Sequence, residues 1–365
     1  MYYKVVVIGA GPAGISTAYH LKKNNINCCL IDKFEFPRFK LCGGLITEKT
    51  LKLLESYGIT DFNKVIKERV NKVNILSNGK KVITFETINY FNLVNRMEFD
   101  NWFLEKYLEL DGIAIFGSKV SKIDLDRKEL VVGSRIIHFD YVVAADGAKG
   151  ISSKILDKKI NYAFGMETDI ETIFCKGDKH HIDLDVSIAK DGYSWRFPKG
   201  DVTTLGFAFS FNQNINYHEL RKKILPEKCK IKGAFLPYGG RVKVVANKNG
   251  MILVGDAAGF VDSITGEGTY YAIKSGEIAA YSLTTKSPIN EYIKRTKYIC
   301  KEVNKAWHFI SFFYKFRKII LRLIPKHKNF IAFLCDNQVS TQKGNYSMIK
   351  LIYLYKTQRE KSINF

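Results

Sequence analysis

Residues 4–32 read KVVVIGAGPAGISTAYHLKKNNINCCLID. The apolar, β-branched run at 4–8 predicts a strand that is buried on both faces of a parallel sheet. A helical pattern begins after it, and a second apolar run at 28–31 ends on Asp32. This order of strand, helix and strand predicts a βαβ unit and places the chain in the α/β class.

Three glycines in this stretch follow the spacing GxGxxG. Gly9 permits the tight turn from strand to helix, Gly11 lets the backbone approach a pyrophosphate, and Gly14 lets the helix pack close to the strand. The helix N-terminus offers free N–H groups and a partial positive charge to the phosphates. Asp32 follows at the spacing that suits hydrogen bonds to ribose hydroxyls. The stretch therefore predicts a site for an ADP moiety, and alone it does not separate NAD from FAD.

The composition is that of a globular chain larger than one ordinary domain, with 365 residues of which 46% are hydrophobic. The formal net charge is +21, but the lysines are spread along the chain without a nucleic-acid-binding signature, so we interpret the charge as a solvated basic surface. The seven cysteines show no CxxC spacing, which argues against a metal site and a redox dithiol. The chain begins with its first strand, so we expect a cytoplasmic protein with reduced thiols.

Two later strands also lead into a glycine and an acid. The apolar run 136–145 precedes Asp146-Gly147, and the run 251–254 precedes Gly255-Asp256 and a glycine-rich loop. Ligands of open α/β sheets bind at the carboxyl ends of the strands, so both acids are expected beside the nucleotide. The helix start at 266–268 would direct its positive end at the same ligand.

Residues 192–211 have the pattern of antiparallel strands that carry an aromatic face. Phe207 and Phe209 alternate at period two, and Tyr193, Trp195 and Phe197 precede them. For Phe207 and Phe209 taken singly, core packing is the favoured interpretation, whereas Trp195 and Phe197 are the stronger candidates for a pocket wall.

Three separated motifs together resemble the FAD-dependent oxidoreductases of the para-hydroxybenzoate hydroxylase fold. They are GAGPAG with Asp32, ADG at 145–147, and GDAAG at 255–259 running into TGEG at 265–268. Within that fold the chain is most similar to the geranylgeranyl reductase family. The features that carry this finer likeness are Pro37-Arg38, Lys40, Cys42-Gly43-Gly44, Tyr193, Trp195 and FPK at 197–199.

The resemblance implies a set of ligand contacts. FAD would be held by Gly9, Gly11, Pro12, Ala13, Gly14, Asp32, Lys33, Arg38, Cys42, Gly43, Gly44, Arg96, Asp146, Gly255, Asp256, Gly266 and Gly268. Substrate would be bound by Tyr193, Trp195, Phe197, Phe207 and Phe209, and Cys42-Gly43-Gly44 would face the isoalloxazine as the candidate catalytic segment. Gly150 stands where the family has serine, and Ser263 where it has proline. No metal is expected.

The predicted fold is a Rossmann-type FAD-binding domain (1–70, 93–160 and 246–297) with an inserted antiparallel β-sheet substrate domain (71–92 and 161–245). A hairpin with Asn78-Gly79 as its turn belongs to the inserted sheet. A basic, apolar, helical C-terminal region, 298–365, follows, with thirteen Lys and Arg against three Asp and Glu. Its amphipathic segment 309–324 can lie on an anionic membrane or pack on the protein, and the pattern fits both. The apolar segment 348–355 predicts a further helix or strand.

These features predict an FAD-dependent oxidoreductase that reduces carbon–carbon double bonds of an isoprenoid or other apolar, lipid-like substrate. No second GxGxxG is present, so NAD(P)H would dock transiently, or another reduced carrier would supply the electrons. One alternative is a flavin-dependent monooxygenase or halogenase that acts on a small aromatic compound. A second is a flavin-binding protein without turnover at a membrane surface. The oligomeric state stays open, and nucleic acid is not an expected partner.

Overall fold

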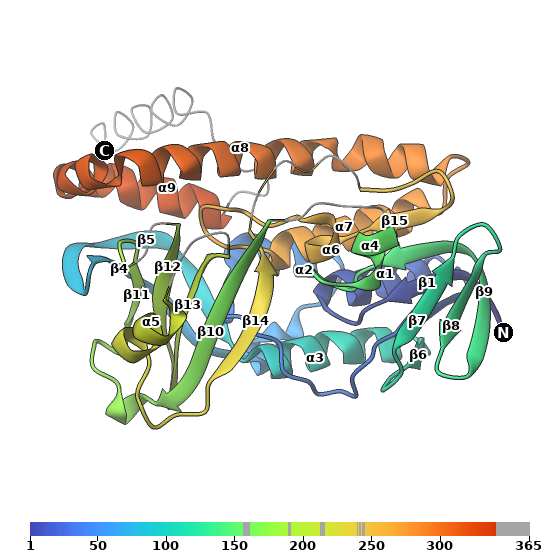
Figure 1. The fold of residues 1–365 in the computed structure, drawn as a ribbon, viewed down its shortest axis with the longest axis horizontal. Coiled ribbons are helices and arrows are strands. Elements are labelled where there is room, and N and C mark those ends of the chain that lie inside the picture. Colours follow the sequence, from blue (N-terminus) through green and yellow to red (C-terminus); the bar gives the residue numbers. More distant parts are fainter. Residues whose placement is uncertain are drawn as a thin grey trace. The chain divides into compact units, whose positions relative to one another are not determined.

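The computed structural model describes residues 1–155, 161–188, 191–211, 216–238, 240, 242 and 245–340. The chain forms two compact units (Figure 1). The first comprises Met1–Lys40, Arg96–Tyr162 and Phe235–Trp307, and the second comprises Leu41–Asn95, Ala163–Ala234 and His308–Phe365.

The first unit is built on five parallel strands in the order β6-β2-β1-β9-β15. Their bounds are β1 Tyr2–Ile8, β2 Cys28–Ile31, β6 Ile113–Ile115, β9 Arg135–Ala144 and β15 Met251–Leu253. An antiparallel extension, β7 Val120–Asp124 and β8 Glu129–Val132, continues the sheet beside β9. The predicted βαβ unit is confirmed, because β1 and β2 pair in parallel and α1, Pro12–Lys23, lies between them in the chain.

The other helices of this unit are α3 Arg96–Leu108, α4 Ile151–Ile155, α6 Gly255–Ala258 and α7 Thr269–Ser282. Helices α1 and α7 pack closely, as Figure 1 shows. A Cβ at Gly276 of α7 would lie 2.5 Å from the carbonyl oxygen of Ala13, and the Ser16 hydroxyl donates to the Ile273 carbonyl at 2.7 Å. This contact fixes the helix that follows the glycine-rich loop against the helix that follows Asp256.

The second unit contains an eight-stranded sheet in the order β14-β10-β13-β12-β11-β4-β5-β3. The strands are β3 Leu45–Thr47, β4 Ile66–Ser77, β5 Lys80–Val94, β10 Tyr162–Glu171, β11 His181–Asp185, β12 Gly192–Lys199, β13 Val202–Ser210 and β14 Lys232–Pro237. The β4–β5 hairpin is confirmed, with positive φ at Asn78 and Gly79. The sheet is not wholly antiparallel as expected, because β11 pairs with β4 in parallel.

The boundaries between the units differ from the expected ones. We expected residues 1–70 and 93–160 in the nucleotide-binding part, whereas Leu41–Asn95 belongs to the second unit. The reason is that β3 pairs with β5, α2 (Glu48–Ser56) contacts β5, and β4 begins at Ile66, before the expected hairpin. The short helices η1 Asp61–Lys64 and η2 Thr172–Phe174 also belong to this unit.

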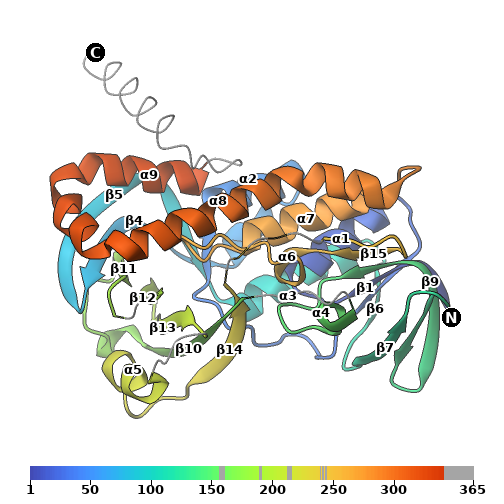
Figure 2. The ribbon, with the colours of Figure 1, turned by 45° about the horizontal axis from the view of Figure 1, so that its top comes forward.

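Each face of the second sheet has its own core. One core contains Trp195 and Phe197 of β12 and is covered by α9, Lys328–Ser340, which lies along β5 (Figure 2). The other contains Phe207 and Phe209 of β13 and is covered by α5, Tyr217–Ile224. Successive side chains of a strand point to opposite faces, and cross-strand neighbours share one. Trp195 faces Gly206 across the ladder, so it lies on the side opposite Phe207.

The expected amphipathic helix at 309–324 is the last part of a longer helix, α8, Pro288–Leu323. The short helix η3, Ile324–His327, contains Pro325 and leads into α9. The segment 348–355 lies outside the described residues. Among the helices that the structure describes, none combines the length and the apolar character needed to cross a bilayer.

Candidate functional site

The three motifs that the sequence singled out lie at the ends of neighbouring strands. Gly9 follows β1, Asp146 follows β9, and Gly255 follows β15. Strands β1 and β15 both pair in parallel with β9, so the three loops share one edge of the sheet. The sequence predicted this convergence, and the structure confirms it. Such an edge is where α/β sheets bind their ligands.

The glycine-rich loop forms a concave backbone surface, and two of its three glycines leave no room for a side chain. A Cβ at Gly9, where φ is +101°, would overlap the carbonyl oxygen of Ala145, and one at Gly14 would overlap the Gly9 carbonyl oxygen. Gly11 is different, because a Cβ there would meet only the Arg38 guanidinium, at 3.6 Å. Gly9 and Gly14 are therefore required by packing, while the space beside Gly11 is available to a ligand.

The α1 N-terminus opens onto this concave surface with Pro12, Ala13 and Gly14 as its first residues. No side chain caps it and its first turn carries no acid, which leaves it suited to a phosphate. Asp32 at the end of β2 accepts hydrogen bonds from the Ala10 N–H at 2.7 Å and from the Phe34 N–H at 3.0 Å. Lys33 points elsewhere, since it is exposed and its Nζ lies 4.9 Å from the centre of the Phe34 ring.

Two arginines share one buried carboxylate beside the loop. Arg96 forms a bidentate pair with Asp100, from Nε to Oδ1 at 2.9 Å and from Nη2 to Oδ2 at 3.1 Å. Arg38 Nη1 approaches the same carboxylate at 3.3 Å, and its Nη2 donates to the Ala10 carbonyl at 3.2 Å. Asp100 is fully buried and was missed, although its i,i+4 spacing from Arg96 was a usable signal.

Asp146 is held by the start of α4. Its carboxylate accepts hydrogen bonds from the Ser152 backbone N–H at 3.0 Å and from the Ser152 hydroxyl at 2.6 Å. A Cβ at Gly150 would overlap this carboxylate. The departure from the family pattern at Gly150 thus has a local explanation: the carboxylate occupies the space of a side chain there, and Ser152 supplies the hydroxyl.

Replacing Ser152 by alanine tests this arrangement. Burial raises the pKa of Asp146, and the hydrogen bonds from Ser152 oppose that rise. Ser152→Ala should therefore raise the pKa of Asp146 further and lower the free energy of unfolding near neutral pH by about 1.5–3 kcal/mol. A raised folded-state pKa means that the destabilisation is present when the carboxyl is charged and shrinks as the pH falls and the carboxyl is protonated.

Urea denaturation at neutral and acidic pH measures this effect. Ser153→Ala is a matched control, because that hydroxyl donates to the uncharged Gly150 carbonyl at 2.8 Å. A loss for Ser152→Ala that is the same at both pH values would contradict the assignment.

The third loop places an acid next to a helix start. Asp256 lies in α6, and its Oδ2 is 3.3 Å from Lys40 Nζ. A Cβ at Gly268, the N-cap of α7, would lie 3.4 Å from Asp256 Oδ1 and 2.9 Å from Val261. The structure therefore brings Gly255, Asp256 and Gly268 together, and Lys40 joins them.

Two further positions of this loop have distinct environments. Gly266 has a φ of +72°, which favours glycine. Ser263, where the family has proline, is buried, and its hydroxyl has no hydrogen-bond partner among the described residues.

In the second unit, the Cys42-Gly43-Gly44 segment lies on two aromatic rings. A Cβ at Gly43 would be 2.5 Å from the Phe197 ring and 3.1 Å from Trp195 Nε1. The Cys42 backbone N–H donates to Glu167 Oε1 at 3.1 Å, and the Gly44 N–H donates to Cys42 Sγ at 3.4 Å. Glu167, a buried acid that fixes this segment, was not singled out by the sequence.

The aromatic residues expected to bind substrate divide into two groups. Tyr193, Trp195 and Phe197 form a row on one face of β12, with ring centres 5.9 and 6.3 Å apart. The buried Trp195 Nε1 has no hydrogen-bond partner among the described residues. The expectation for Phe207 and Phe209 is corrected: both are fully buried in the opposite core under α5 and have no surface to offer a substrate.

The comparisons with known proteins agree with this geometry. Residues 2–174 match the model of the FAD binding domain family. The chain is 33% identical to an uncharacterized protein of Methanosarcina barkeri, over 86% of this chain and 84% of that protein. It is 26% identical to the digeranylgeranylglycerophospholipid reductase of Methanococcus vannielii, over 90% of each chain.

Solved structures show the same fold. A geranylgeranyl bacteriochlorophyll reductase-like protein from Thermoplasma acidophilum superposes with a TM-score of 0.73 at 20% identity, over 96% of this chain and 95% of that one. A flavin-dependent brominase gives a TM-score of 0.70 at 16% identity, over 99% of this chain and all of that one. The chain belongs to the same family as the Methanosarcina barkeri protein, and it is an FAD-dependent oxidoreductase that is similar to the geranylgeranyl reductases.

The match to the FAD binding domain makes FAD the cofactor. The residues present fit it, since a cradle of three glycines, an uncapped helix N-terminus and Asp32 suit the ADP half. The individual roles of the other predicted contacts, from Arg96 to Gly268, stay predictions.

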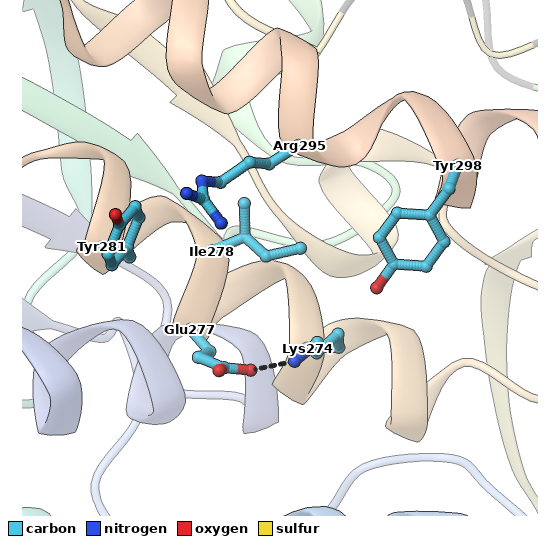
Figure 3. A pocket seen from close by; sticks show the side chains of 6 residues that line it. All are labelled: Lys274, Glu277, Ile278, Tyr281, Arg295 and Tyr298. Carbon is cyan, nitrogen blue, oxygen red and sulfur yellow. Dashed lines mark hydrogen bonds and ion pairs between the residues drawn. The ribbon is translucent and has the colours of Figure 1, made fainter. Parts of the chain in front are cut away.

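A separate pocket of about 210 Å³ lies between α7 and α8 of this flavoprotein (Figure 3). It is lined by Lys274, Glu277, Ile278, Tyr281, Arg295 and Tyr298. Its Lys274 pairs with Glu277 at 2.6 Å, and its Arg295 stacks on Tyr281 and pairs with Glu291. None of the predicted site residues lines it.

Proposed function

We propose that this flavoenzyme reduces carbon–carbon double bonds of an isoprenoid or a similarly apolar lipid. The observation that carries the proposal is the close packing of the Cys42-Gly43-Gly44 segment on Trp195 and Phe197. The segment combines a glycine backbone with apolar rings that are 7 and 6% exposed, and such surroundings suit a planar ring system and a hydrocarbon better than a polar substrate. The reductases among the relatives, whose names describe geranylgeranyl substrates, support the same class.

The chain's own residues bind, orient and exclude water in this reaction. Bound reduced FAD would supply the hydride for one alkene carbon. The glycine-rich loop and α1 N-terminus would hold the pyrophosphate, with Arg38 adding positive charge. Trp195 and Phe197 would keep water from the reacting bond, and Cys42, oriented by the Gly44 N–H, is the candidate donor of the proton for the second alkene carbon. NAD(P)H or another reduced carrier would restore the electrons.

Adding one methyl group at Gly43 tests the role of this segment. Gly43→Ala places a Cβ 2.5 Å from the Phe197 ring and should displace the segment. We expect turnover to fall by about tenfold, because small misplacements at a reacting centre are costly, while FAD stays bound. Turnover and the flavin-to-protein absorbance ratio are the two readouts. Unchanged turnover would contradict the role given to Gly43.

A flavin-dependent monooxygenase or halogenase is the second candidate, since a brominase shares the fold. The two are separated by comparing lipid extracts of cells with and without the protein by mass spectrometry. The proposed reductase shifts an isoprenoid lipid by the mass of two hydrogen atoms for each reduced bond. Unchanged lipids, together with hydroxylation or halogenation of a small aromatic compound by the purified enzyme, would replace the proposal with the second candidate.

A further inference from the structure

The C-terminal half of α8 carries a row of apolar side chains on its outer surface. Phe312, Phe316, Ile319 and Leu323 are 56, 37, 59 and 48% exposed. Their spacing of four, three and four residues places them on one face of the helix. The rings of Phe312 and Phe316 lie 4.7 Å apart, so the row is continuous at its start. We call these four residues the α8 stripe.

The opposite face of the same helix is attached to the protein. The Tyr314 hydroxyl is 2.9 Å from both the N–H and the carbonyl oxygen of Gly192 at the start of β12. Arg317 Nη1 donates to the Val186 carbonyl at 3.2 Å, and Ile310 is buried. These contacts fix the rotation of α8 about its axis. Because the α8 stripe lies on the opposite side of the helix, its side chains point to the outside of the second unit.

Basic side chains flank the stripe. Lys315, Lys318 and Arg322 are exposed, and none of the three pairs with a carboxylate among the described residues. From 303 to 335 the sequence contains seven Lys and Arg and no Asp or Glu. Proteins without a partner at a given surface rarely expose a continuous apolar row there. Along the helix, this row is also surrounded by positive charges without negative ones, which is typical of a binding surface.

We propose that the α8 stripe docks on the surface of an anionic lipid bilayer. Its apolar side chains would enter the boundary between headgroups and acyl chains, and the flanking cations would lie at the negatively charged headgroups. Because the face carries positive charge, repulsion between like charges disfavours a second copy of this face as its partner.

Flotation of the full-length, FAD-loaded protein with vesicles tests the proposal. Vesicles of phosphatidylcholine with phosphatidylserine should carry the protein upward at low salt, and those of phosphatidylcholine alone should not. High salt should release it, because it screens the headgroup attraction. Lys315→Gln/Lys318→Gln/Arg322→Gln should weaken binding by about a hundredfold, since each cation near the surface contributes about 1 kcal/mol.

Two further variants separate the stripe from apolar surface in general. Phe312→Gln/Ile319→Gln should weaken flotation by at least about tenfold through loss of buried apolar area. Ile173→Gln/Phe174→Gln is the matched control, because these η2 side chains are 72 and 74% exposed in the same unit but lie outside α8. Binding by the control should equal that of the unaltered protein, and all variants should keep their FAD absorbance.

Several results would overturn the proposal. They are no flotation of the full-length protein, equal flotation with both vesicle types, and equal losses in the stripe and control variants. A dimer that forms with rising concentration and is abolished by Phe312→Gln/Ile319→Gln would assign the stripe to a second copy of the chain instead. None of these readouts depends on catalysis, so the proposed reaction can fail while the docking surface stands.

Discussion

Gly11→Ala should lower the affinity for FAD by about a hundredfold, or about 3 kcal/mol, while leaving the stability of the FAD-free protein almost unchanged. The structure gives the reason. Gly11 has ordinary extended backbone angles, with φ of −81° and ψ of 177°, and an added Cβ would meet only the Arg38 guanidinium at a van der Waals distance of 3.6 Å. The methyl group would instead occupy the space through which a pyrophosphate reaches the α1 N-terminus.

Gly14→Ala is the control that separates ligand binding from packing. Its Cβ would overlap the carbonyl oxygen of Gly9, so we expect this variant to lose stability without FAD as well. Titration with FAD, followed by flavin fluorescence, and thermal unfolding of the FAD-free protein measure the two effects. An unaltered FAD affinity for Gly11→Ala would show that the pyrophosphate does not bind beside Gly11 in this loop.

Arg96→Ala should lower the free energy of unfolding by about 3–5 kcal/mol, because it leaves the buried Asp100 carboxylate without its bidentate partner. Asp100 is fully buried and the Arg96 side chain is 6% exposed, so little water is available to replace the lost hydrogen bonds. Arg38, at 3.3 Å from the same carboxylate, compensates only in part. Chemical denaturation of the purified protein measures the loss.

The double variant Arg96→Ala/Asp100→Asn tests the cause. Removing the charge of the carboxylate should restore a large part of the lost stability, because the penalty arises from an unpaired buried charge. If the double variant is no more stable than Arg96→Ala, the stability that Arg96 contributes does not come from its interaction with the Asp100 carboxylate. Arg69→Ala serves as the reference, because the Arg69 guanidinium donates to the neutral side-chain amides of Asn63 and Asn92.

Local backbone chemistry made the first part of the site predictable. The GxGxxG stretch specifies a turn, a close approach and a helix start within six residues, and the β1–α1–β2 unit follows that pattern. Asn78-Gly79 likewise specified its hairpin, because both residues tolerate positive φ. The position of Asp146 and Asp256 at the same edge followed from the parallel order of their strands.

Features that depend on distant partners were not predictable in this way. The ion pair between Lys40 and Asp256 joins loops 216 residues apart, and the parallel pairing of β11 with β4 joins strands more than a hundred residues apart. Period-two alternation showed that Phe207 and Phe209 share a face, but it does not say what covers that face. The boundary between the two units at Lys40 depends on the pairing of β3 with β5. No local sequence pattern predicts which strand β3 pairs with.

The most direct test of the account is a single turnover without oxygen. The FAD-loaded enzyme is reduced chemically, mixed with a geranylgeranyl lipid, and followed by flavin absorbance and by mass spectrometry of the lipid. The account predicts that the oxidised flavin spectrum returns and that the lipid gains two hydrogen atoms for each flavin oxidised. A flavin that stays reduced until air is admitted, with the lipid unchanged, would contradict it.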